Sequence, residues 1–172
     1  MALKNLAPPL LDETSAGFIE SGVTIYASSR TDQNIPVMGR PVGCRVSADR
    51  RTVTLLFTTE CVSELLDEIR NSGQIAVVFS QPSTSQTIQL KANDAAVISP
   101  QKGDAKLIEQ HREAFVANVC PLGYSEALVR AFMWFDPADL SAVRFTPQEA
   151  FVQTPGPRAG EPLKGGVRAD TG

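Results

Sequence analysis

The stretch of residues 52–80, TVTLLFTTECVSELLDEIRNSGQIAVVFS, decides the fold class because the spacing of its apolar residues changes twice. Its first part carries apolar side chains at alternate positions, which predicts a strand over 52–58. Residues 60–72 then carry them at helical spacing, and Gly73 is suited to end that helix. Alternation returns over 74–80, so a second strand is predicted there. A helix framed by two strands indicates a domain of mixed α and β structure.

The same reasoning extends in both directions from this stretch. Upstream it predicts a helix and two strands, and downstream it predicts one long strand bent near Asn93, two helices and a last strand. The connections between successive strands are short, and residues 48–51 are compact enough for a hairpin, so antiparallel pairing is favoured. In chain order the added elements are helix 12–20, strands 23–28 and 37–47, strand 86–99, helix 104–119, a short helix from Ser125 and strand 141–146.

The order of these elements, with runs of strands and few helical crossovers, suits an antiparallel sheet closed into a small barrel. The predicted class is therefore α+β, with six strands and flanking helices. A chain of 172 residues is long enough for one domain with its own core. We assign residues 1–154 to this domain, with an irregular leader over 1–11. Residues 155–172 are rich in Pro and Gly and poor in large apolar side chains, so an extended or disordered tail is expected.

Composition narrows the function classes. The net charge of −3 provides no general attraction for nucleic acid or for an anionic membrane. No apolar run approaches the roughly 20 residues that span a bilayer, and the first residues lack the layout of a secretory signal. The three cysteines form no CxxC pair, and an odd number argues against a disulfide framework. We therefore expect a cytoplasmic protein that binds neither nucleic acid nor membrane.

Few residues are suited to catalysis on their own. The single histidine, His111, falls on the apolar stripe of its predicted helix, where it either supports packing or serves as a haem ligand or proton donor. A metal centre of the His/Cys type needs several ligands at defined spacing, so no metal site is predicted. The sequence has no nucleophile elbow, P-loop or dinucleotide fingerprint. By elimination, reactivity is expected to belong to a bound cofactor, and no catalytic side chain is assigned.

The most informative positions lie in the strand predicted over 37–47. Arg40 and Arg45 present planar forks of donors suited to phosphate oxygens. Gly43 lies between them and permits a flat ring or another backbone to approach closely. Because the arginines are an odd number of residues apart, a regular strand would point them to opposite faces. Either Pro41 marks a bulge or one arginine alone faces a ligand, and the alternative is a solvated face with a glycine at a barrel bend.

Two further groups of polar side chains are candidates for binding an anion or a ring. Where the strand over 52–58 runs into a helix, Thr58, Thr59 and Ser63 place hydroxyls beside the N–H groups of a helix start. Such N–H groups, if free, form an anion site, and the alternative is simple capping. In the later long strand, Gln89 and Lys91 share one face, which either faces solvent or lines a wet cavity and contacts a ring.

Together these motifs resemble the FMN-binding split-barrel family that includes pyridoxamine 5′-phosphate oxidase, over about residues 15–156. The family's R-M-V-L-L-K motif is matched in spacing by Arg40-Pro41-Val42-Gly43-Cys44-Arg45. Its F-Y-T-N-Y-x-S-R-K motif aligns with residues 57–65, where Thr59 and Ser63 match and Glu64-Leu65 replaces the Arg-Lys pair. Its R-Q-V-R-I-E-G motif aligns with residues 86–92, without the arginines. Since that Arg-Lys pair supports the phosphate in the oxidase, the chain is identified as a small relative of the oxidase and not as the oxidase itself.

The resemblance implies a split, six-stranded antiparallel β-barrel with flanking helices, and a homodimer with FMN held in grooves between the subunits. It also implies an oxidoreductase that transfers hydride through the flavin N5, with a small-molecule substrate that the motifs do not specify. The alternatives are a non-catalytic flavin- or haem-binding module and a deazaflavin-dependent reductase. The residues implied to bind the cofactor are Arg40, Val42, Gly43, Arg45, Thr58, Thr59, Ser63, Gln89 and Lys91.

Overall fold

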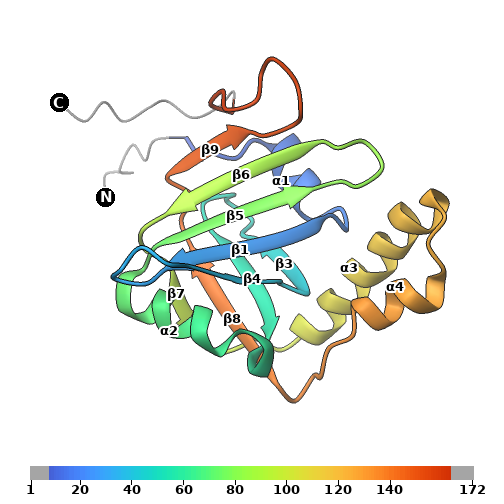
Figure 1. Cartoon of the computed structure of the whole chain (residues 1–172), viewed down its shortest axis with the longest axis horizontal. Coiled ribbons are helices and arrows are strands. Elements are labelled where there is room, and N and C mark those ends of the chain that lie inside the picture. The colour runs from blue at the N-terminus through green and yellow to red at the C-terminus, as the bar shows by residue number, and fades with distance from the viewer. Residues whose placement is uncertain (1–7, 164–172) are drawn as a thin grey trace, which may run out of the picture.

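The computed structural model describes residues 8–163, which form two antiparallel sheets with helices around them (Figure 1). The five-stranded sheet has the order β2-β1-β5-β6-β9, and the four-stranded sheet has the order β3-β4-β8-β7. The strands are β1 (Thr24–Arg30), β2 (Pro36–Gly39), β3 (Gly43–Val46), β4 (Val53–Thr58), β5 (Ile75–Ser80), β6 (Thr87–Ala92), β7 (Ala96–Ile98), β8 (Leu140–Phe145) and β9 (Glu149–Val152). The helical elements are α1 (Glu13–Ile19), the 3₁₀ turn η1 (Thr59–Val62), α2 (Ser63–Ser72), α3 (Asp104–Val119), the 3₁₀ turn η2 (Cys120–Leu122) and α4 (Glu126–Phe132).

The chain passes from one sheet to the other once through α2, between β4 and β5, and at three further places where consecutive strands are broken apart. The strand predicted over 37–47 is wrong as one element, because β2 and β3 belong to different sheets and the chain breaks at Arg40-Pro41-Val42. Pro41 has no N–H to continue a ladder, which explains the break. The strand predicted over 86–99 is wrong in the same way, since β6 ends at Ala92 and β7 begins at Ala96 in the other sheet. The third of these breaks separates β8 from β9.

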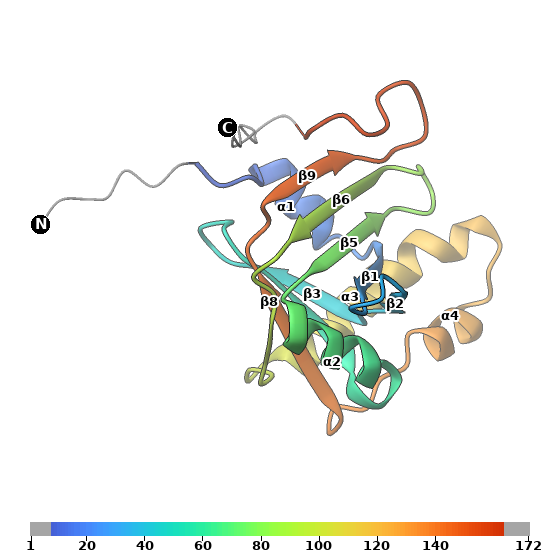
Figure 2. The same ribbon diagram turned by 60° about the vertical axis from the view of Figure 1, so that its left-hand side comes forward.

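All strand pairings in the described chain are antiparallel, so the predicted α+β class with antiparallel sheets is confirmed. Figure 2 shows β9, β6 and β5 of the first sheet, with β3 and β8 of the second beneath them. Within residues 8–163, no strand pairing joins an edge of one sheet to the other. The expected closed barrel of six continuous strands is therefore not observed.

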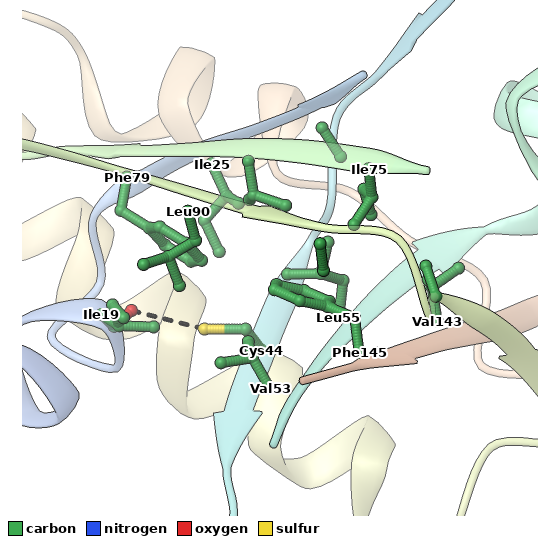
Figure 3. Packing of buried hydrophobic residues seen from close by; sticks show 14 of the residues in the cluster. Ile19, Ile25, Cys44, Val53, Leu55, Ile75, Phe79, Leu90, Val143 and Phe145 are labelled. Carbon is green, nitrogen blue, oxygen red and sulfur yellow. Dashed lines mark hydrogen bonds between the residues drawn. The ribbon is translucent and has the colours of Figure 1, made fainter. Parts of the chain in front are cut away.

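The main hydrophobic core lies between the two sheets (Figure 3). Alternate residues of β5 point into it, as the periodicity predicted, and Phe79 among them is completely buried. Cys44 of β3 also lies in this core, where its thiol donates to the backbone oxygen of Ile19 at 3.3 Å. Burial raises the pKa of the Cys44 thiol, so it stays protonated and packs as a small apolar residue. The alternate apolar residues of the strands predicted over 52–58 and 74–80 all belong to this core; besides Phe79 they are Val53, Leu55, Phe57, Ile75 and Val77.

Helix α3 packs on the outer side of the four-stranded sheet and forms a second apolar cluster there. Gly43 of β3 makes the contact close, since a β-carbon at this position would lie 3.2 Å from Ile108 Cγ1 and 3.4 Å from Ile108 Cα. The close approach that the sequence suggested at Gly43 is therefore made by a helix. The cluster consists of Val42, Leu56, Ile108, Phe135 and Ala142.

The chain beyond β9 turns back along that strand. Val152 donates its N–H to Glu161 O at 2.9 Å, and Leu163 donates to Ala150 O at 2.9 Å. Leu163 also packs against the main core. Residues 164–172 of the predicted tail and residues 1–7 of the predicted leader lie outside the described residues. Among the helices that are described, none is long and apolar enough to cross a membrane.

His111 is buried where α3 meets the chain just before β1. It is 4% exposed, and its Nε2 lies 3.0 Å from the backbone oxygen of Val23. Burial lowers the pKa of His111 and outweighs the bond to Val23, which acts in the opposite direction. The packing role considered for this residue is the one that the geometry supports.

His111 is expected to make the fold less stable in mild acid. Since its pKa is lowered in the folded chain, the unfolded chain takes up the proton first as the pH falls through about 6.5. The free energy of unfolding therefore decreases below that pH, by at most about 1.4 kcal/mol per pH unit from this group. Urea denaturation of His111→Gln should show a shallower decline than the wild type from about pH 6.5 downward. Equal declines would show that His111 titrates alike in the folded and unfolded chains.

Candidate functional site

A cleft opens at the break between β2 and β3, where the edge of the five-stranded sheet meets the end of β4. Its volume is about 320 Å³, and clefts of about 300–1,000 Å³ are usual for small-molecule sites. Side chains come from both sheets, from η1 and from the segment after α4. The cleft is lined by Tyr26, Met38, Gly39, Arg40, Val42, Thr58, Cys61, Val62 and Trp134.

Arg40 lies at the break and reaches across to the end of α4. Its Nη2 donates to Phe132 O at 2.5 Å, and its guanidinium carbon lies 4.0 Å from the centre of the Phe132 ring. Its Nη1 lies 3.1 Å from Met133 Sδ. These partners are uncharged, and no carboxylate within residues 8–163 forms an ion pair with Arg40. Burial lowers the pKa of Arg40, against the opposite effect of nearby Tyr26 and Cys61. A partly buried cation without an acid beside it favours an anionic ligand.

Thr58 ends β4 in the wall of the cleft. The residue is 8% exposed, and its hydroxyl oxygen is buried without a hydrogen-bond partner. A buried hydroxyl in this condition costs about 1–3 kcal/mol, so folded proteins rarely retain one without a reason. A ligand in the cleft would supply the missing bond once the Thr58 hydroxyl, which has no exposed surface of its own, turns toward it. The position of this hydroxyl is the clearest indication that the cleft is a binding site.

Large apolar side chains surround the cleft. Trp134 is 63% exposed, Met38 is 65% exposed and Tyr26 is 43% exposed. Aromatic side chains of this kind provide flat faces on which a planar ring can stack. The motifs did not point to any of these three residues. Trp134 is the only tryptophan of the chain, and its place between Phe132 and Phe135 was the one signal that marked this segment.

The cleft brings together Arg40, Val42 and Thr58 from the residues predicted to bind the cofactor. The remaining six, Gly43, Arg45, Thr59, Ser63, Gln89 and Lys91, do not line it. Of the two arginines, Arg40 alone lines the cleft, and Pro41 lies in the break between β2 and β3.

Arg45 lies on the outer side of the four-stranded sheet, where it forms an ion pair with Asp104 in the first turn of α3. Asp104 is 4% exposed and also accepts a hydrogen bond from Gln101 N at 2.7 Å. The pair therefore connects β3 to the start of α3, beside the position where Gly43 lets the helix approach.

The chain itself pairs the N–H groups at the helix start. Thr59 N donates to Asp139 O at 2.9 Å, and Glu60 N donates to Asp139 Oδ2 at 3.0 Å. The hydroxyl of Thr59 lies 2.8 Å from that of Ser141. Ser63, where α2 begins, is exposed. Two of the N–H groups that the anion site required to be free are thus capped by Asp139, from the segment that precedes β8.

Gln89 and Lys91 lie on the outer face of the five-stranded sheet, which agrees with the shared face predicted for them. Gln89 Oε1 accepts from Gln153 Nε2 at 3.2 Å. Lys91 Nζ lies 5.2 Å from the centre of the Phe151 ring and lines a separate hollow on this face.

Alanine in place of Arg45 is expected to destabilise the fold and to leave ligand binding in the cleft unchanged. Without the guanidinium, Asp104 stays buried with only Gln101 N as a partner, which costs about 1–3 kcal/mol. Urea denaturation measures this loss, and Arg45→Lys should recover part of it because it keeps the charge. A variant that is as stable as the wild type but no longer binds the cofactor would place Arg45 in the site instead.

Comparison with solved structures finds the same fold in several proteins. HupZ of Group A Streptococcus matches with a TM-score of 0.51 at 12% identity, over 87% of this chain and 99% of that chain. A candidate pyridoxamine 5′-phosphate oxidase from Lactobacillus delbrueckii matches with a TM-score of 0.50 at 15% identity, over 82% and 93%. An F420 reductase matches with a TM-score of 0.52 at 10% identity, over 81% and 98%. No family model and no curated protein matches the sequence.

Identities of 10% to 15% show the fold alone. The chain has the fold of the pyridoxamine 5′-phosphate oxidase-like split-barrel proteins, and the resemblance inferred from the motifs is confirmed at this level.

Proposed function

We propose that the chain is an FMN-binding flavoprotein with oxidoreductase activity, and that the cleft at the β2–β3 break holds part of the cofactor. The observation that carries the proposal is the buried, unpartnered hydroxyl of Thr58 in the same cleft as the Arg40 cation. FMN offers what such a cleft lacks, namely negative charge and a planar ring with polar atoms at its edge. The fold, shared with proteins named as an oxidase and a reductase, supports the same choice.

Four of the lining residues have distinct parts in this proposal. Arg40 holds negative charge of the cofactor, and its bond to Phe132 O fixes the plane of its guanidinium. Thr58 forms its missing hydrogen bond with a polar atom of the ring or of the ribityl chain. Trp134 and Tyr26 stack against the flat ring. Bound FMN supplies hydride transfer at N5, so the chain needs no nucleophile of its own.

The affinity of the chain for FMN is expected to be moderate. Glu64-Leu65 stands where the family has an Arg-Lys pair, so the phosphate meets fewer cations. Charge-assisted hydrogen bonds are roughly twice as strong as neutral ones, so the absence of that pair weakens phosphate binding. Arg45 does not replace it, because its guanidinium forms an ion pair with Asp104.

We also propose a homodimer in which a second copy covers the mouth of the cleft and supplies further cofactor contacts. Met38 and Trp134 are exposed there, and a partner packed against them would remove apolar surface from water. Sedimentation equilibrium should give twice the chain mass of 18.5 kDa, and Trp134→Glu should shift the protein toward the monomer.

FMN is expected to bind the purified protein and to quench the emission of Trp134, the only tryptophan. Thr58→Val keeps the shape of the side chain and removes the hydroxyl, so it should weaken binding about tenfold. Arg40→Met should weaken it by about tenfold or more, because a charge-assisted contact is lost. Lys102→Met removes an exposed cation outside the cleft and is the matched control, which should bind like the wild type.

Four outcomes would contradict the proposal or part of it. A wild type that does not take up FMN at millimolar concentration refutes it outright. Uptake of a deazaflavin and not of FMN would favour the reductase alternative, and a Soret band on haem addition would favour the haem-binding one. Equal FMN affinity in the wild type and Thr58→Val would remove Thr58 from the site.

A further inference from the structure

A second hollow lies on the outer face of the five-stranded sheet, which Figure 1 views directly with the other sheet behind it. Its volume is about 450 Å³, larger than that of the cleft, and the two share no lining residue. Its walls come from the ends of β1, β5, β6 and β9. Nothing in the proposed flavin site uses this hollow.

Strand register explains why the sheet is hollow here. Ser28 of β1 pairs with Ala76 of β5, and Ala76 pairs with Lys91 of β6, so their side chains lie in one outward row. Adjacent strands are about 4.8 Å apart, which places Lys91 about 10 Å from Ser28. The small side chains of Ser28 and Ala76 form the floor, and longer side chains on either side form the walls.

Arg30, at the end of β1, is held in place by two neutral amides. Its Nε donates to Gln74 Oε1 at 2.9 Å, and its Nη1 donates to Asn34 Oδ1. Only two of the guanidinium donors are used in this way, so the others remain for a ligand. Because both partners are uncharged, they orient the guanidinium without neutralising it.

Lys91 supplies a second cation on the far side of the floor. Among residues 8–163, no carboxylate forms an ion pair with Lys91 or with Arg30. Glu149 lies opposite Lys91 in the pairing of β6 with β9 and also lines the hollow, but it does not pair with the ammonium.

We propose that this hollow is an anion-binding site for a small phosphate-bearing molecule, separate from the cleft. The planar fork of Arg30 suits two oxygens of a phosphate, and the Lys91 ammonium adds positive charge on the far side of the floor. The neutral floor of Ser28 and Ala76 leaves room for the group that carries the phosphate. Glu149 opposes a simple anion and limits its affinity.

The test is a titration of the full chain with inorganic phosphate at low salt, followed by amide chemical shifts in NMR spectra. Saturable shifts are expected at Ser28, Ala76 and Lys91. Arg30→Met should weaken binding by about tenfold, and Glu149→Gln should strengthen it because a repulsive charge is removed. Lys102→Met removes the same charge elsewhere and should leave the affinity unchanged.

Shifts that do not saturate, or an equal loss of affinity in Arg30→Met and Lys102→Met, would overturn the proposal, because net charge alone would then account for binding. Measuring FMN binding and phosphate binding in the same variants distinguishes the hollow from the cleft. Arg30→Met is expected to bind FMN like the wild type, and Thr58→Val is expected to bind phosphate like the wild type. If Arg30→Met loses FMN and phosphate together, the hollow is part of the cofactor site and is not a separate one.

Discussion

Alanine in place of Phe79 is expected to lower the free energy of unfolding by about 3–5 kcal/mol. The Phe79 side chain is completely buried and lies in the cross-strand row Ile25–Phe79–Ile88 of the five-stranded sheet. Figure 3 shows it pointing into the space between the sheets, near Leu90. Truncation removes apolar contacts and leaves a cavity that two opposed sheets cannot collapse to fill. Equilibrium urea denaturation near neutral pH measures the loss.

The neighbouring residue provides the control. Val78 is only partly buried and points to the opposite face of the same strand. Val78→Ala removes fewer atoms from a partly wet position, so a loss of about 1 kcal/mol or less is expected. Equal losses at the two positions would contradict the assignment of Phe79 to the core face and, with it, the register of β5.

The order of the elements could be predicted from the sequence because it depends on local periodicity. The strands over 52–58 and 74–80 appear as β4 and β5 with ends that differ by a single residue. The helix between them begins as the 3₁₀ turn η1 and continues as α2, which ends at Ser72. The next residue, Gly73, has a φ of 67°. Gly73 thus has the left-handed conformation that its position after a helix predicted.

The crossings between the sheets could not be predicted in this way. Alternation continues on both sides of Pro41, so the sequence resembles one strand across the break. Which sheet a strand joins is decided by its partner, and β2 pairs with β1 whereas β3 pairs with β4. The same holds for β6 and β7, which pair with β5 and β8. Hydrophobic spacing carries no information about these partners.

The candidate site shows the same limit at the level of single residues. In the sequence, Arg40 and Arg45 both match the spacing of a family motif, and Thr58 and Thr59 are both candidates for the anion site. The structure separates them through partners far away along the chain: Asp104 lies 59 residues from Arg45, and Asp139 lies 80 residues from Thr59. A residue becomes a candidate for ligand binding when the fold leaves it without such a partner, and this is visible only in three dimensions.

Alanine in place of Gly22 is expected to lower the free energy of unfolding by about 2–5 kcal/mol. Gly22 has a φ of 75°, and an L-residue in this region loses about 1–2 kcal/mol. A β-carbon there would lie 2.5 Å from Ala114 Cβ and 2.6 Å from both Ala114 C and Phe115 N. Backbone atoms of α3 cannot rotate away as a side chain can, so the helix itself must shift, at a further cost of about 1–3 kcal/mol.

Two hydrogen bonds that join α3 to residues 22 and 23 resist this shift of the helix. One joins Asn118 Nδ2 and Gly22 O at 3.2 Å, and the other joins His111 Nε2 and Val23 O at 3.0 Å. Gly17→Ala is the matched control with the opposite sign. Gly17 is exposed within α1, and its added β-carbon meets nothing within 4 Å. Alanine there should stabilise the fold by about 0.5–1 kcal/mol through helix propensity. If Gly22→Ala also stabilised the fold, α3 could not lie as close to Gly22 as it does in the structure.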